Sequence, residues 1–206
     1  MIEILKSGGP IMIPLMALSM VALAIVLERL WVLRRSNYLR DETVSTLSHY
    51  LGDRQFKAAV GYCNMNPGPF TNLVAALVEN RFAPYDELKE ILEDTGRREL
   101  MGLQRGLPAL GTIVAGAPLL GLLGTVLGMI KIFTSISFSG LGDPHALSGG
   151  ISQAMITTAI GLVIGIPTLV AYNLLAAKSD ALEAEIEARA TQLVTKLRGN
   201  STEAIA

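Results

Sequence analysis

The stretch PHALSGGISQAMITTAIGLVIGIPTLVAYNLLAA, residues 144–177, runs for 34 residues without an Asp, Glu, Lys or Arg. Two other long apolar stretches also lack these residues, with 25 residues at 106–130 and 21 residues at 7–27. A helix crosses the hydrocarbon core of a bilayer with about 20 residues. All charged side chains lie in the other 126 of the 206 residues, at a density typical of water-exposed protein. The chain is therefore predicted to be an all-α membrane protein with three transmembrane helices, and this distribution argues against a soluble globule.

The first apolar stretch is predicted to be a retained anchor and not a cleaved signal peptide. It follows charged residues, and no small-residue cleavage site ends it. It runs instead into the segment 28–31 and then into two arginines. Trp31, Arg34 and Arg35 are predicted to form an interfacial anchor at the membrane surface.

The distribution of positive charge predicts the orientation. Lys and Arg number 11 in residues 28–105 and 4 in residues 178–206, whereas the N-terminal tail has only Lys6 and the second link only Lys131, at its margin. Cytoplasmic loops carry the excess of Lys and Arg. The N-terminus is therefore predicted to be periplasmic and the C-terminus cytoplasmic, which three crossings satisfy. The alternative for the third stretch is a re-entrant or buried pair, but Pro144 and the pair Gly149–Gly150 shorten the apolar run and favour one span.

This topology divides the chain into six predicted parts. They are the periplasmic N-terminus with the first transmembrane helix (1–28), a cytoplasmic helical loop (29–105), the second transmembrane helix (106–133), a short periplasmic link (134–149), the third transmembrane helix (150–177) and a cytoplasmic helical tail (178–206).

The cytoplasmic loop has the pattern of several helices. Gly52 is predicted to close one helix and Asp53 to N-cap the next, over residues 54–63. The segment 67–69, Pro-Gly-Pro, predicts a break, followed by a helix over 70–82. No strong stop lies between Asp86 and the second span, which predicts one long helix running into the membrane.

The tail is predicted to extend the third span as a long helix. Its apolar residues recur at steps of three or four, which is the spacing of a packed helix face. Simple packing on the loop helices is the preferred interpretation of this stripe. Its members are Leu182, Ile186, Ala190, Leu193 and Leu197.

Motifs for enzyme chemistry are missing from the sequence. It has no phosphate-binding GxxxxGK[ST] loop, no HExxH and no GxSxG. Its two histidines, His49 and His145, are predicted to lie on opposite sides of the membrane, and Cys63 is the only cysteine. The net charge of −1 gives no indication of nucleic-acid binding. No enzyme activity, cofactor or metal site is predicted.

Small and polar residues form lines along the second and third spans. The lines contain Ala117, Gly121, Thr125 and Gly128 in one span and Gln153, Thr157, Gly161, Gly165 and Thr168 in the other. Small residues let helix backbones approach, and polar residues in a membrane usually face a bundle interior or a watered cavity. A pore is one interpretation. The other is plain packing, in which each threonine returns its hydroxyl to its own backbone.

Three prolines, Pro108, Pro118 and Pro167, lie in these two spans and can kink them. Helices bent in this way need support from neighbours, which favours a multi-subunit bundle. Neither 106–130 nor 144–177 contains an Asp, Glu, Lys or Arg. If the protein moves protons, the titrating acid must come from another chain, since threonine and glutamine do not titrate near neutral pH.

At these residues the chain resembles the MotA/TolQ/ExbB proton channel family. The strings that carry the resemblance are APLLGLLGTV at 117–126, GISQAMITTAIGL at 150–162, Ile166-Pro167, Tyr172-Asn173 and Glu28-Arg29-Leu30-Trp31. The similarity extends over nearly the whole chain, including the order of three spans with a large first cytoplasmic loop. MotA itself fits less well because it has four spans.

The resemblance implies a subunit of a bacterial inner-membrane motor that forms a ring, typically a pentamer. A single-span partner of the ExbD/TolR/MotB type would sit inside and carry an essential aspartate, and its periplasmic domain would transmit force to a TonB-type protein. Membrane lipid would surround the ring. Thr125 and Thr158 align with the pore threonines of the family.

The resemblance and the polar pattern together predict the site residues. The pore and proton pathway is assigned to Thr125, Thr158, Thr157 and Gln153, and the small residues lining the pore are Gly121, Gly128, Gly161 and Gly165. ExbB and TolQ members often carry Glu where this chain has Gln153. A glutamine cannot ionise, so its role would be to donate hydrogen bonds at the pore mouth.

Several alternatives stay open at this point. The pattern is closer to ExbB-like chains than to TolQ, a subunit of the Tol-Pal envelope and cell-division system. A non-conducting membrane scaffold, a subunit of another transporter such as an ABC permease, and a membrane enzyme are the rival classes. The absence of paired acids, histidines or metal ligands makes the enzyme the weakest of them.

Overall fold

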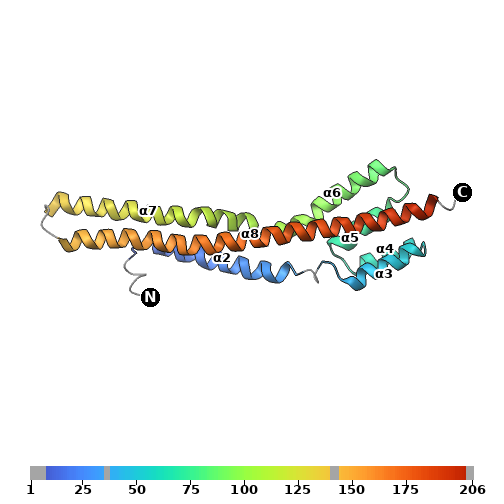
Figure 1. The fold of residues 1–206 in the computed structure, drawn as a ribbon, viewed down its shortest axis with the longest axis horizontal. Helices are drawn as coiled ribbons and strands as arrows, with labels where there is room; N and C mark the ends of the chain where they lie inside the picture. The colour runs from blue at the N-terminus through green and yellow to red at the C-terminus, as the bar shows by residue number, and fades with distance from the viewer. Residues whose placement is uncertain (1–7, 35–37, 140–143, 203–206) are drawn as a thin grey trace. The chain divides into compact units, whose positions relative to one another are not determined.

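A computed structural model describes residues 8–34, 38–139 and 144–202, and all regular structure within these ranges is α-helical. The prediction of an all-α protein is therefore confirmed. The helices, shown in Figure 1, are α2 (Met12–Val32), α3 (Asp41–Gly52), α4 (Phe56–Met65), α5 (Pro69–Glu79), α6 (Tyr85–Gln104), α7 (Leu107–Ser139) and α8 (Pro144–Thr202).

Three of these helices are long and apolar enough to cross a membrane. The candidate spans are Met12–Val32, Leu107–Ser137 and Ser148–Leu193, and each contains a window with a mean hydropathy of 2.0 or more. The three predicted spans are thus confirmed by length and composition. The second and third belong to long helices of 33 and 59 residues, as predicted.

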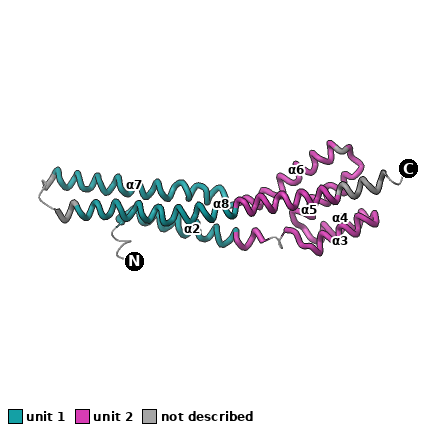
Figure 2. Tube along the Cα trace, in the orientation of Figure 1, with its two compact units in different colours: residues 1–29, 106–175 teal, residues 30–105, 176–206 magenta. Residues whose placement is uncertain are grey.

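The chain divides into two compact units, coloured separately in Figure 2. The first unit comprises the chain up to Arg29 together with Gly106–Leu175. Its core joins all three candidate spans, because Met12 and Leu15 of α2 and Ala117 of α7 are buried together with Ile160 of α8 packed against them. This unit positions the polar residues of the spans.

The second unit comprises Leu30–Arg105 and the chain from Ala176 onward. Its helices pack in chain order, α3 on α4, α4 on α5 and α5 on α6. The apolar stripe predicted on the tail is buried at its described positions, Leu182, Ile186, Ala190 and Leu193. Its last member, Leu197, lies outside the described side chains, as does His145, and Arg35 lies outside the described residues.

The predicted N-cap at Asp53 is wrong. Asp53 instead follows the last turn of α3, where its backbone N–H donates to the carbonyl oxygen of His49 at 3.0 Å. Arg54 has a φ of 58°, and Gln55 N–H then donates to the Tyr50 carbonyl oxygen at 2.8 Å. A left-handed residue after a helix lets the chain satisfy the last carbonyl groups. The chain around Asp53 therefore ends α3, and α4 begins only at Phe56.

The prediction of one uninterrupted helix from Asp86 into the second span is also wrong. Helix α6 ends at Gln104 and α7 begins at Leu107. Between them Gly106 has a φ of 82°, a left-handed conformation that glycine adopts without steric cost. Pro108 then fits the first turn of α7, because the backbone N–H groups of the first turn have no acceptor within the helix and the N–H that proline lacks is not needed there. A single glycine can thus stop a helix without any cluster of breaking residues.

The thiol of Cys63 provides a test of the packing in the second unit. Cys63 is 1% exposed, and burial, together with a smaller effect of the Glu79 charge, raises its pKa from 9.0 to about 11. Because the thiolate is the reactive form, we expect maleimide to label the folded chain at pH 8 about 100-fold more slowly than the unfolded chain. Labelling kinetics in mild detergent and in denaturant measure this ratio. Equal rates would show that α4 does not pack as described.

Candidate functional site

The contact between α7 and α8 is made by residues with little or no side chain. A Cβ added to Gly121 would lie 3.0 Å from the carbonyl oxygen of Thr157, and a Cβ added to Gly161 would lie 2.7 Å from the carbonyl oxygen of Ala117. Real Cβ atoms essentially never lie closer than 3.0 Å to a neighbouring heavy atom, so the distance of 2.7 Å at Gly161 excludes a side chain there unless the backbone moves. The glycines therefore let the two backbones touch, as small residues do in membrane bundles.

The same close contact continues along both helices. A Cβ on Gly128 would meet the Cβ of Ala154 at 3.0 Å, and a Cβ on Gly165 would meet Pro118 at 3.0 Å. The contacts pair later residues of α7 with earlier residues of α8, so the two helices run antiparallel (Figure 1). All four glycines predicted to line a pore lie in this contact, and their lining of a pore stays a prediction.

Thr158 joins the two helices by a hydrogen bond. Its hydroxyl donates to the carbonyl oxygen of Gly121 on α7, with 3.2 Å between the two oxygens. The glycine leaves room for this bond because a Cβ at Gly121 would lie 3.1 Å from the Cα of Thr158. Thr158 is half-buried, so its hydroxyl lies at the edge of the helix contact.

Thr125 on α7 is also half-buried, but its hydroxyl donates within its own helix, to the carbonyl oxygen of Leu122 at 2.6 Å. This is the local return of a threonine hydroxyl that the packing interpretation predicts. A hydroxyl oxygen that donates one bond still has lone pairs to accept another. Both threonine hydroxyl oxygens can therefore accept a hydrogen bond from a donor on the uncovered side.

The rotation of the two helices places Thr125 and Thr158 on the same side. Consecutive helical residues are about 100° apart around the axis, since one turn takes about 3.6 residues. Gly124 touches Thr157, and Thr157 also faces the beginning of α2, where a Cβ on Gly8 would lie 3.5 Å from its Cγ2. Thr125 and Thr158 each follow by one position. Viewed from one end, antiparallel helices advance with opposite senses of rotation. One step forward in each therefore turns both threonines to the same side of the pair, away from α2.

This side of the α7–α8 pair is not covered by other parts of the described chain. Large apolar side chains stand exposed on it around the two threonines. They include Leu122, Met129, Met155 and Leu162, with exposed fractions from 43% to 68%. A hydroxyl pair within an exposed apolar surface is an arrangement suited to a contact with another membrane helix.

Thr157 and Gln153 lie on the opposite side, towards α2. Thr157 is fully buried, and its hydroxyl donates to the carbonyl oxygens of Ala154 at 2.8 Å and Gln153 at 3.2 Å. The side-chain amide of Gln153 lies directly against Gly9, just before α2. The structure thus separates the four predicted pathway residues into two pairs. A pathway role for Thr157 and Gln153 stays a prediction.

The predicted interfacial anchor lies at the end of α2. Trp31 is 69% exposed and Arg34 is exposed, as a membrane-surface anchor requires. The sequence interpretation did not single out Arg29, which is only 4% exposed and forms an ion pair with Glu28 at 3.0 Å. Its Nε would lie 3.5 Å from a Cβ on Gly106, so this arginine packs against the turn that begins α7.

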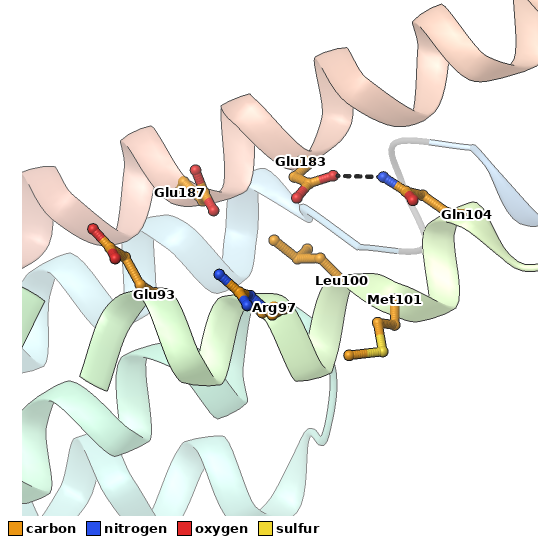
Figure 3. Close-up of a pocket in the computed structure, with 7 residues that line it drawn as sticks. All are labelled: Glu93, Arg97, Leu100, Met101, Gln104, Glu183 and Glu187. Carbon is orange, nitrogen blue, oxygen red and sulfur yellow. Dashed lines mark hydrogen bonds between the residues drawn. The ribbon is translucent and has the colours of Figure 1, made fainter. Parts of the chain in front are cut away.

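The second unit contains a polar cleft of about 320 Å³ between α6 and α8, shown in Figure 3. Gln104 Nε2 donates to Glu183 Oε2 at 3.4 Å across it. Within the described residues, no group of three His, Cys, Asp or Glu side chains could hold a metal ion.

Comparison with known proteins shows the family to which the chain is related. The sequence model of the MotA/TolQ/ExbB proton channel family matches residues 68–188, which include both threonines. The chain is 32% identical over 176 residues to the putative biopolymer transport protein ExbB-like 1 of Synechocystis sp., with 84% of this chain and 69% of the relative covered.

Two further relatives cover most of both chains. The biopolymer transport protein ExbB of Neisseria meningitidis serogroup A is 28% identical, over 94% of this chain and 95% of the relative. The Tol-Pal system protein TolQ of Haemophilus influenzae is 27% identical, over 84% of this chain and 81% of the relative. With its three candidate spans, the chain is a multi-pass membrane protein that belongs to the non-enzymatic MotA/TolQ/ExbB proton channel family.

Proposed function

We propose that the protein is a ring-forming subunit of an inner-membrane proton-channel motor. With a single-span partner of the ExbD type, it would convert proton motive force into mechanical work on a TonB-type protein for outer-membrane import. The family match and the relatives named ExbB support the channel class. The pair Thr125 and Thr158 would form the channel wall.

One observation carries this proposal. The two threonines lie together on the uncovered side of α7 and α8, yet the stretches 106–130 and 144–177 hold no Asp, Glu, Lys or Arg that could relay a proton beside them. A proton path needs such a group. The missing acid is an aspartate on the partner helix, and the threonine hydroxyls would hydrogen-bond to it or to water beside it.

The proposed ring follows from the same surface. Two helices of one chain cannot enclose a pore, so several copies must place their Thr125–Thr158 sides around one axis. We propose a homopentamer, as the family resemblance implies. The glycine contact between α7 and α8 supports this wall by keeping the two helices of each copy together.

The orientation follows from the positive charges. With 11 of 17 Lys and Arg between residues 28 and 105, this loop is proposed to be cytoplasmic and the N-terminus periplasmic. One proton crossing about 100 mV releases roughly 2.3 kcal/mol. Repeated crossings would drive the ring against its partner in steps.

Reconstitution into liposomes tests the proposal. We expect liposomes that hold the chain and a partner with one span and one aspartate to dissipate an imposed pH gradient. Liposomes with the chain alone should hold the gradient, because no carboxylate then lies beside the two threonines. The partner with Asp replaced by Asn is the matched control. Full flux from the chain alone would refute the need for a foreign carboxylate.

The similarity to a TolQ protein supports a second candidate, a subunit of a Tol-Pal-type envelope and cell-division system. A deletion strain separates the two candidates. Loss of TonB-dependent import with an intact envelope fits the first, and envelope leakage with normal import fits the second. A non-conducting scaffold predicts normal function after both threonines are made apolar.

A further inference from the structure

The entry into α2 is a tight turn built from two glycines. Gly9 has a φ of 71°, and its carbonyl oxygen accepts a hydrogen bond from the Met12 N–H at 3.1 Å. The Pro10 carbonyl oxygen accepts a bond from the Ile13 N–H at 3.2 Å. Gly8 is buried, although it precedes the helix. The turn is therefore a packed element of the first unit.

This turn fits against α8 only because it lacks side chains. A Cβ on Gly9 would overlap the amide nitrogen of Gln153 and lie 3.0 Å from its Cδ. A Cβ on Gly8 would lie 2.5 Å from the Cγ of Met12 and 3.5 Å from the Cγ2 of Thr157. The Gln153 side chain thus occupies the space that any other residue at position 9 would need.

We propose that the turn at Gly8–Gly9 and the side chain of Gln153 form a clasp that sets the rotation of α8. Gln153 is then a positioning residue, which acts on the channel through Thr158 and does not itself face the pore. This consequence for conduction rests on the proposed channel function, whereas the clasp itself does not.

Only a few contacts connect the clasp to Thr158. Gln153 and Thr157 lie one turn apart on the α2 side of α8, and Thr157 fills the space opposite Gly124 of α7. Interiors packed this closely transmit a displacement to their neighbours. If α8 rotates when the clasp opens, Thr158 leaves the position from which its hydroxyl reaches the Gly121 carbonyl oxygen at 3.2 Å.

A neutral side chain suits this place better than a charged one. The amide of Gln153 lies against Gly9, just before a candidate span whose first residue, Met12, is buried in the apolar core. An ionised carboxylate there would pay a larger desolvation cost than an amide. The clasp thus gives a physical reason for glutamine at this position in this chain.

A double-mutant cycle tests the clasp in the full chain with its partner in lipid nanodiscs. The variants are Gly9→Asn, Gln153→Ala and the pair together. Asn tolerates a left-handed φ better than most residues. The backbone strain that Gly9→Asn adds is the same with Gln153 and with Gln153→Ala, so it cancels in the cycle. The readout is hydrogen exchange of the Met12 and Ile13 amides, whose acceptors lie in the turn.

We expect each single variant to speed this exchange. The double variant should exchange more slowly than the product of the single effects predicts, by about tenfold, because the Asn side chain fills the space that Gln153→Ala leaves. This corresponds to a coupling of about 1.4 kcal/mol, within the range for residues in contact. Gly116→Ala, at a site where a Cβ meets nothing within 4 Å, is the matched control and should change nothing. If the exchange rate of the double variant equals the product of the two single effects, Gly9 and Gln153 are not coupled and the clasp is refuted.

Proton flux through the partner-containing complex tests the positioning role. We expect Gln153→Ala to lower the flux and the added Gly9→Asn to restore part of it. If exchange shows coupling but flux is not restored, Gln153 does not act through the clasp. If even the unaltered complex does not conduct, the proposed channel function fails, while the exchange cycle still decides the clasp.

Discussion

Replacement of Thr158 by Val is expected to abolish partner-dependent proton flux while the chain still folds and assembles. Valine keeps the shape of threonine but removes the hydroxyl that donates to the Gly121 carbonyl oxygen at 3.2 Å. Hydrogen bonds between membrane helices contribute only about 1 kcal/mol to stability, so the contact of α7 and α8 should survive. Flux in liposomes with the partner, and size-exclusion chromatography of the complex, measure the two effects.

Thr157→Val is the matched control for this prediction. It makes the same change one residue earlier, at a side chain that is fully buried on the α2 side and whose hydroxyl returns to its own helix. We expect its flux to stay close to that of the unaltered chain. If Thr157→Val abolished flux and Thr158→Val did not, the assignment of the channel side would be reversed. Flux at the level of the unaltered chain in both variants would refute the role of the Thr158 hydroxyl in the channel.

Replacement of Gly161 by Leu is expected to separate α7 from α8. Even a Cβ at this position would lie 2.7 Å from the Ala117 carbonyl oxygen and 3.1 Å from the Cα of Gly121, and both are backbone atoms that cannot turn away. Overpacking of a close contact costs about 1 to 3 kcal/mol, and a leucine facing backbone should reach the upper part of this range. We expect a lower thermal unfolding temperature in detergent, with loss of assembly.

Gly149→Leu is the control on the same helix. A Cβ at Gly149 meets nothing within 4 Å, and the residue is exposed near the beginning of α8. Leucine has a higher helix propensity than glycine, so this variant should be at least as stable as the unaltered chain. Similar destabilisation by both variants would mean that the loss comes from the leucine itself and not from the close contact at Gly161.

The sequence pattern predicted helix breaks and buried helix faces correctly where the type of residue alone decides them. The Pro-Gly-Pro break at 67–69 separates α4 from α5, and the apolar stripe of the tail is buried at its described positions. The errors came at Asp53 and Gly106, where the conformation of one residue decides how a helix ends. Asp53 has the side chain of an N-cap, but the left-handed Arg54 after it makes this segment the end of α3.

The candidate site was predicted as a set of residues but not as an arrangement. Its threonines and glycines stand out because polar and small side chains are rare in charge-free stretches. Their spacing does not show which of these residues lie on the same side of the α7–α8 pair. The lines within residues 117–128 and 153–168 each include residues of the α2 side and of the uncovered side. The Gly8–Gly9 turn was missed altogether, although the sequence Gly-Gly-Pro before an apolar stretch is a usable signal of a turn.

The sequence by itself determined that this chain has three apolar stretches, that they lack Asp and Glu, and that two of them contain the threonines assigned to the pore. These properties depend only on which residues occur and how many follow one another. The tertiary structure decided that Thr158 lies at the uncovered side while Thr157, its neighbour in the chain, is enclosed by α2 and α7. A rotation of about 100° per residue separates the two, and only contacts between helices fix the angle from which that rotation is counted.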